Sequence, residues 1–248
     1  MIIIKTGKEI EIMKKGGRYL AEIIKEVSAA VKPGVSTADL DKKAQFLIHK
    51  KKARASFKGY RDYPASICAS INSEVVHSIP SENKVLKKGD ILGLDIGLEY
   101  QGMYTDMAVT VPVGNISKPA KRLINVTKKA LELGLRQVKA GNQIGDISHA
   151  IQIYAEANGF NVVKSLVGHG VGKKVHEEPP IPNYGEPKTG PVMAAGMTLA
   201  IEPMLALGSA EVITAEDGWT AKTKDGSLAA HFEATVAVTR EGHLVLTK

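Results

Sequence analysis

Two apolar runs with the alternation of β-strands flank a short polar stretch near the middle of the chain. They are ILGLDIGLEY (91–100) and MYTDMAVTVPV (103–113), and residues 100–102 are typical of a tight turn. Side chains alternate with period two, so a loop of two or four residues places Asp95 and Asp106 on one face. Two carboxylates among apolar residues need a cation, a shared proton or an arginine. The alternative is a wider turn that leaves one acid facing solvent.

Helical periodicity occurs in two pairs of segments, near residues 7–31 with 37–52 and near 118–138 with 144–157. Before the second helix of each pair, the segments VKPGVSTADL and VKAGNQIGDI resemble each other at an offset of 107 residues. One explanation is a chance resemblance between two helices that each follow a glycine. The other is a duplicated unit of helices and strands.

The same offset favours duplication, because adding 107 to Asp95 gives Glu202, and each acid follows an aliphatic residue. We therefore expect two α/β halves, with a site between them on the sheet. Two further strand-like or glycine-bounded strings, VGHGVG and HFEATVAV, contain His169 and Glu233. With Asp95, Asp106 and Glu202, these two residues make a set of four carboxylates and one imidazole. That ligand set suits a pair of divalent first-row metals, which would balance the charge and activate a bridging water or hydroxide.

Composition limits the classes of protein that fit. A chain of 248 residues with 44% hydrophobic residues forms one large domain or two small ones. Cys68 is the only cysteine, and no stretch is long enough for a signal sequence or membrane span, so we expect a cytoplasmic protein without membrane contact. The net charge of +7 and several lysine pairs indicate either weak electrostatic ribosome association or an ordinary lysine-rich surface.

Seven ordered motifs give the chain a resemblance to the type I methionine aminopeptidases. They are GYRDYPASICASINSEVVHSIP, LDIG, TDMAVT, VGHGVG, VHEEPPIPNYG, AIEPM and DGWTAKTKDGSLAAHFEATVAVT. The resemblance implies the pita-bread (creatinase-like) fold of the α+β class. In that fold two pseudo-symmetric α/β halves share a central curved antiparallel sheet, with helices on its outer face. We expect a single catalytic domain over 1–248, with halves of approximately 1–115 and 116–248.

The resemblance also implies an activity. It is the metal-dependent removal of the initiator methionine from nascent polypeptide N-termini whose second residue is small. Nothing in the sequence requires a partner subunit, so we expect a monomer. Two divalent ions (cobalt, manganese, iron or zinc) would be held by Asp95, Asp106, His169, Glu202 and Glu233. Glu202 is also the expected proton acceptor, because it can touch both a metal and the attacking water.

Two imidazoles and an apolar pocket complete the implied site. The family places His77 and His176 beside the scissile amide, although a lone histidine is more often structural. The positions that correspond to the methionine pocket are Phe57, Tyr60, Tyr63, Cys68 and Trp219. Ordinary core packing is the alternative for these side chains, most seriously for Phe57.

Three positions depart from the family pattern. Ser78 replaces a common glycine, Val175 a common phenylalanine, and His231 a frequent glutamine. We expect Ser78 to alter backbone freedom beside His77, Val175 to loosen selectivity, and His231 to be structural, with no ligand lost. The alternative function is a non-enzymatic binding protein of the same fold, associated with ribosomes or RNA.

Overall fold

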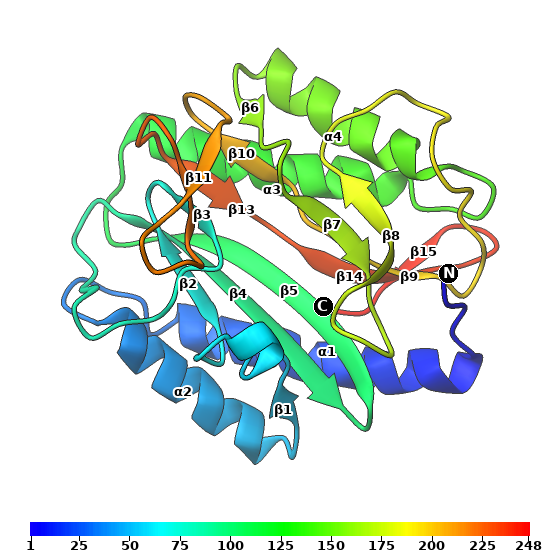
Figure 1. The fold of residues 1–248 in the computed structure, drawn as a ribbon, viewed down its shortest axis with the longest axis horizontal. Helices are drawn as coiled ribbons and strands as arrows, with labels where there is room; N and C mark the ends of the chain where they lie inside the picture. The colour runs from blue at the N-terminus through cyan, green and yellow to red at the C-terminus, as the bar shows by residue number, and fades with distance from the viewer.

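The computed structural model describes residues 1–248 and contains two helix pairs that lie on opposite sides of a group of strands (Figure 1). The first pair is α1 (Gly7–Ser28) and α2 (Thr37–Lys50), and the second is α3 (Lys118–Arg136) and α4 (Ile144–Ala157). A short 3-10 helix, η1, spans Tyr60–Asp62. None of the helices is long and apolar enough to cross a membrane.

The strands form small antiparallel sheets. In the first, the long hairpin of β4 (Ile91–Tyr100) and β5 (Met103–Pro112) is extended beyond β4 by β1 (Arg54–Ala55) and β2 (Cys68–Ile71). The largest sheet has the order β15-β14-β9-β7-β8, and two three-stranded sheets have the orders β13-β10-β6 and β11-β12-β3. The remaining strands are β3 (Glu74–Val76), β6 (Asn161–Val162), β7 (Val167–Gly170), β8 (Glu177–Pro182), β9 (Thr198–Ile201), β10 (Met204–Ala206), β11 (Val212–Thr214), β12 (Ala221–Thr223), β13 (Ala229–His231), β14 (Ala234–Val238) and β15 (His243–Val245).

The sequence repeat has a structural counterpart at the same offset. Helices α2 and α4 both have 14 residues and start 107 positions apart. Before α2, the Ser36 amide donates to the Asp39 carboxylate, and before α4 the Gln143 amide donates to Asp146. These capping interactions explain why both helices begin where they do, since a side chain three residues on satisfies the amide that precedes the helix.

Paired strand residues in the two halves are also related by the offset of 107 residues. Arg54 pairs with Glu99 in the first half, and Asn161 pairs with Ala206 in the second, a shift of 107 on both strands. The isolated bridges Ser36–Val85 and Gln143–Val192 differ by the same number.

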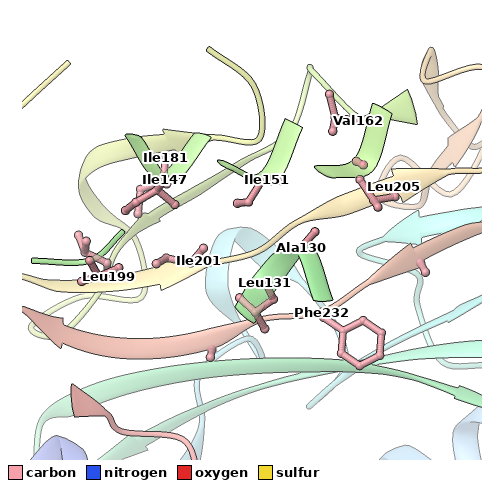
Figure 2. Packing of buried hydrophobic residues seen from close by; sticks show 14 of the residues in the cluster. Ala130, Leu131, Ile147, Ile151, Val162, Ile181, Leu199, Ile201, Leu205 and Phe232 are labelled. Atoms are coloured by element: carbon pink, nitrogen blue, oxygen red, sulfur yellow. The ribbon is translucent and has the colours of Figure 1, made fainter. Parts of the chain in front are cut away.

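Each half has its own apolar core. In the first half, α1 and α2 pack side chains such as Leu20 and Leu40 against Leu94 on β4. The second core packs α3 and α4 against the strands; Leu131, Ile147, Ile151 and Leu199 are among its members (Figure 2). These cores hold the strands that carry Asp95 and Asp106 and the strands that directly adjoin Glu202 and Glu233, so the packed strands position the acids.

Candidate metal centre

The β4–β5 hairpin carries two of the acids as the alternation predicts. A two-residue turn, Gln101–Gly102, joins the strands, with φ values of 51° and 78° that are typical of the tight turns preferred in hairpins. Asp95 is directly opposite Ala108, and Asp106 is directly opposite Gly97. The two acids are therefore diagonal neighbours on the same face, and the wide-turn alternative does not apply.

The other candidate ligands come from the second half of the chain. His169 lies on β7, Glu202 directly follows β9, and Glu233 directly precedes β14. The His169 Nε2 atom lies 3.7 Å from Glu202 Oε1. One ligand atom each from Asp106, His169 and Glu233 lies within 4.8 Å of the other two, which is close enough for a shared metal ion.

Hydrogen bonds hold the strands of the two halves together at this point. The Glu233 amide donates to the Ala108 carbonyl at 2.9 Å. The Thr110 hydroxyl donates to the His231 carbonyl at 2.8 Å, and the His231 amide donates back to Thr110 Oγ1 at 2.9 Å. Strand β5 therefore runs beside β13 and β14, which places acids from both halves around one space.

Burial makes this group of acids costly without a counterion. It raises the pKa of Asp106 to about 7 and raises the pKa values of Asp95, Glu202 and Glu233, and the negative charge of neighbouring acids raises the last three further. Asp95 Oδ1 and Glu233 Oε1 are buried and have no hydrogen-bond partner. Buried oxygens without partners and carboxylates that destabilise one another are what divalent cations would satisfy, so the residues fit a metal centre.

His169 has the protonation state that a metal ligand requires. Burial lowers its pKa to about 4, so its imidazole is neutral at pH 7. Its Nδ1 lies 2.8 Å from the Gly170 carbonyl and donates to it, because a carbonyl can only accept. This leaves the Nε2 lone pair free on the side of Glu202, which is the arrangement of a metal-ligating histidine fixed by an outer hydrogen bond.

All of the predicted site residues line one cavity of about 240 Å³. That is below the roughly 300–1,000 Å³ of pockets that enclose drug-sized ligands, and it suits a single amino-acid side chain. The lining comprises the acids and His169 together with Phe57, Tyr60, Arg61, Tyr63, Cys68, His77, His176 and Trp219.

Aromatic contacts order the cavity wall. The Tyr63 hydroxyl lies 3.0 Å from the Ile67 carbonyl and 3.1 Å from the Ser78 carbonyl, which share its one hydrogen, and its ring meets Trp219 edge-on at 5.1 Å. The Tyr60 hydroxyl lies 3.1 Å from His176 Nδ1, and the His176 ring is 4.3 Å from that of His169. The wall is therefore apolar toward Trp219 and carries imidazoles toward the acids.

Space for Phe57 depends on a glycine in β4. A Cβ at Gly97 would lie 2.7 Å from the Phe57 ring, and it would also overlap the Ser56 hydroxyl. The glycine opposite Asp106 thus allows the Phe57 ring to reach the cavity beside the acids.

The structure shows the contacts of two side chains that depart from the family pattern, Ser78 and Val175. Ser78 is fully buried, and its hydroxyl donates to Glu74 and accepts from Lys84, each at 2.7 Å. The positive φ at this point, 59°, belongs to His77 rather than to Ser78. Val175 is buried in the apolar cluster that contains Phe57, Tyr63 and Cys68.

Two neighbours of the site were not predicted. Arg61 lines the cavity from η1, and its sequence context, between Tyr60 and Tyr63, carries no signal beyond proximity. His231, interpreted as structural, is buried, with Nε2 3.6 Å from Glu202 Oε2 and 4.0 Å from Glu233 Oε2. Its spacing of two from Glu233 was the available signal, because alternate residues of a strand share a face.

The fold and the cavity together define a metallopeptidase. The family model of metallopeptidase family M24 matches residues 11–240, and the chain belongs to this family. Methionine aminopeptidase from Clostridium acetobutylicum is 49% identical over 247 residues, covering 100% of this chain and 99% of the relative. Methionine aminopeptidase 1 from Bacillus subtilis is 49% identical over 248 residues, covering 100% of both chains.

The fold matches a solved methionine aminopeptidase structure equally well. The crystal structure of the enzyme from Thermotoga maritima superposes with a TM-score of 0.99 at 48% identity, and the match covers 100% of both chains. The resemblance to type I methionine aminopeptidases is thereby confirmed, as is the expected pita-bread fold of the α+β class.

Proposed function

We propose that this protein removes the N-terminal methionine from polypeptides whose second residue is small, with two divalent metal ions held by Asp95, Asp106, His169, Glu202 and Glu233. The observation that carries the proposal is one cavity in which buried, unpartnered carboxylate oxygens adjoin an apolar wall. The carboxylates would hold the metal ions that hydrolysis requires, and the apolar wall would contact the methionine side chain. The similarity to methionine aminopeptidases supports the same substrate class.

Divalent ions in this site would supply a water molecule of lowered pKa and polarise the scissile carbonyl. Glu202 accepts the proton of the attacking water and delivers it to the leaving nitrogen. Its carboxylate suits this role because burial and the charge of Asp106 raise its pKa, so that it holds a proton more readily than an exposed glutamate. His169 stays neutral, and its Nε2, which lies 3.7 Å from Glu202 Oε1, is available to hold a metal ion beside that carboxylate.

His77 and His176 orient the substrate amide. Both imidazoles line the cavity, and the Tyr60 hydroxyl fixes the ring of His176 through Nδ1. An imidazole N–H directed at the carbonyl oxygen stabilises the charge that develops on it during attack. The apolar part of the cavity wall, which includes Phe57, Tyr63 and Trp219, receives the unbranched thioether, which packs favourably against aromatic edges.

The function is tested by product analysis. Purified protein is stripped with a chelator, resupplied with manganese, and incubated with the peptides Met-Ala-Ser, Met-Leu-Ser and Leu-Ala-Ser. The proposal expects free methionine from the first peptide only, since a close wall excludes a bulky second residue. Cleavage of all three peptides would contradict the methionine pocket, and cleavage of none by folded, metal-loaded protein would favour a binding protein of the same fold.

A further inference from the structure

A buried ion pair, Lys5 with Glu177, lies outside the set of residues that line the cavity. Lys5 Nζ contacts Glu177 Oε2, and the side chains are only 1% and 2% exposed. Burying two charges carries a large desolvation penalty, which the mutual attraction offsets only when the remaining donors and acceptors are also satisfied. Further hydrogen bonds support both groups: Lys5 Nζ also donates to the Ile3 carbonyl at 3.1 Å, and Glu177 Oε1 accepts two backbone amides.

Those two amides belong to the loop that ends in His176. The amides of Lys173 and Lys174 donate to Glu177 Oε1 at 2.5 and 3.0 Å, so the carboxylate closes the loop onto itself. Glu177 is the first residue of β8 and directly follows His176. The orientation of the His176 ring therefore depends on the same short loop that the Glu177 carboxylate holds.

Two glycines, Gly196 and Gly172, lie against Lys5 and leave room for its side chain to reach Glu177. The Lys5 amide donates to the Gly196 carbonyl at 2.8 Å, which fixes the backbone just before α1 begins. On the other side lies Gly172, whose φ of 152° suits glycine, and a Cβ at this position would overlap Lys5 Cε. The segment before α1 in the first half therefore packs against a loop of the second half.

We propose that Lys5 is a positioning residue for His176, acting through Glu177, in the aminopeptidase reaction proposed above. Without the ammonium group, the Glu177 carboxylate is a lone buried charge that turns away from the loop amides or recruits water. The loop then opens and the His176 ring leaves its place beside His169. Displacement of a catalytic group by about 1 Å can cost on the order of 100-fold in rate. Replacing a whole buried ion pair by apolar side chains often leaves the free energy of unfolding unchanged. A positioning role therefore explains this pair better than a stabilising one.

The test is a double-mutant cycle with Met-Ala-Ser as substrate. Lys5→Met keeps an unbranched side chain, one heavy atom shorter, and removes its charge, and His176→Ala removes the imidazole. We expect Lys5→Met to lower kcat by roughly 10- to 100-fold in the wild-type background, with a smaller change in KM. In the His176→Ala background it should have almost no further effect, because residues acting through one group are not additive. Equal losses in both backgrounds would overturn the proposal and assign a general structural role.

A matched control uses a second ion pair on the same loop. Lys173 Nζ lies 2.9 Å from Glu9 Oε1, and this pair is partly exposed. Lys173→Met keeps the backbone amide that Glu177 accepts, so it should leave kcat unchanged. A loss equal to that of Lys5→Met would show that any disturbance of the loop suffices, which contradicts a specific role for Lys5.

A readout without activity separates this proposal from the proposed function. The ring resonances of His176 and the hydrogen-exchange rates of the Lys173 and Lys174 amides are measured in wild type and Lys5→Met. The proposal expects shifted resonances and at least 10-fold faster exchange, and unchanged values would overturn it even if the wild type released no methionine. If Lys5→Met does not fold, Lys5→Met with Glu177→Gln removes both charges while retaining an acceptor for the amides. It should fold and recover the His176 resonances, and a folded double variant with displaced resonances would contradict the mechanism.

Discussion

The backbone of Asp106 and the side chain of Thr235 exchange two hydrogen bonds. The Asp106 amide donates to Thr235 Oγ1, and the Thr235 hydroxyl donates to the Asp106 carbonyl, each at 2.8 Å. Thr235 is fully buried and lies in the second half of the chain, whereas Asp106 lies in the first. One hydroxyl group therefore joins the halves at a candidate metal ligand and helps to set its distance from Glu233.

Replacing Thr235 by valine keeps the shape and removes both hydrogen bonds. Two buried backbone groups would lose their partners, at a cost of about 1–3 kcal/mol each. We expect Thr235→Val to lower the free energy of unfolding by roughly 2–6 kcal/mol in denaturant titrations, and to weaken metal binding. Thr235→Ser retains the hydroxyl and should lose less than half as much. A loss for serine as large as that for valine would contradict the claim that the hydrogen bonds of the hydroxyl are what matters at this position.

The glycines of β4 provide a matched pair for testing the apolar wall. A Cβ at Gly97 would overlap Ser56 and the Phe57 ring, whereas a Cβ at Gly93 would meet Ser70 at an ordinary 3.6 Å. We expect Gly97→Ala to push Phe57 into the cavity and to reduce kcat/KM for Met-Ala-Ser by at least 10-fold, mainly through KM. Gly93→Ala should stay near wild type. The view of Phe57 as a wall of the methionine pocket fails if the two variants behave alike.

Acidity should change the stability of the metal-free protein in a defined direction. Burial raises the pKa of Asp106 to about 7 in the folded state from an ordinary value of 3.8. Its carboxyl therefore binds a proton more tightly when folded, so its favourable contribution is full below pH about 4 and is lost as the pH rises through about 7. In chelator, Asp106→Asn should be more stable than wild type at pH 8 by on the order of a few kcal/mol, and the difference should shrink toward pH 4.

Denaturant titrations at pH 4.5, 6 and 8 check this dependence. With saturating metal at pH 8 the order should reverse, because the ligand that binds the cation has been removed. A metal-free Asp106→Asn protein that is less stable than wild type at every pH would show that the buried carboxylate is balanced by something other than a metal.

The buried imidazole of His231 should support metal binding without being a ligand in the predicted set. Its Nε2 has no hydrogen-bond partner and lies 3.6 Å from Glu202 Oε2. Groups that orient ligating carboxylates typically contribute 10- to 100-fold in metal affinity. Calorimetric titration with manganese should show a loss of about this size for His231→Leu. His231→Gln, which keeps a donor, should bind nearly as tightly as wild type, and equal affinities for all three proteins would contradict the role.

Much of the centre was predictable from sequence because strand parity fixes which side chains share a face. The hairpin around Gln101 and Gly102 placed Asp95 and Asp106 correctly for either short loop length. The repeat predicted where the second helix of each pair begins, and in both cases an aspartate three residues after the N-cap accepts the amide of the N-cap residue.

Other features depend on contacts between distant segments, which local patterns do not encode. The hydroxyl of Thr235 resembles any strand threonine until β5 and β14 are side by side. Lys5 resembles any basic residue before a helix, and its contact with Glu177 spans 172 positions. His231 was interpreted as structural because periodicity alone does not distinguish a core histidine from one that faces buried acids.

The most direct test of the account is methionine release from Met-Ala-Ser as metal is returned to chelator-stripped protein, with wild type and Asp106→Asn measured side by side. The account predicts no release before metal addition, release that rises to saturation with added manganese or cobalt in the wild type, and a loss of at least 100-fold in Asp106→Asn. Release by stripped wild type, or undiminished release by folded Asp106→Asn, would contradict the claim that this cavity is a metal-dependent peptidase centre.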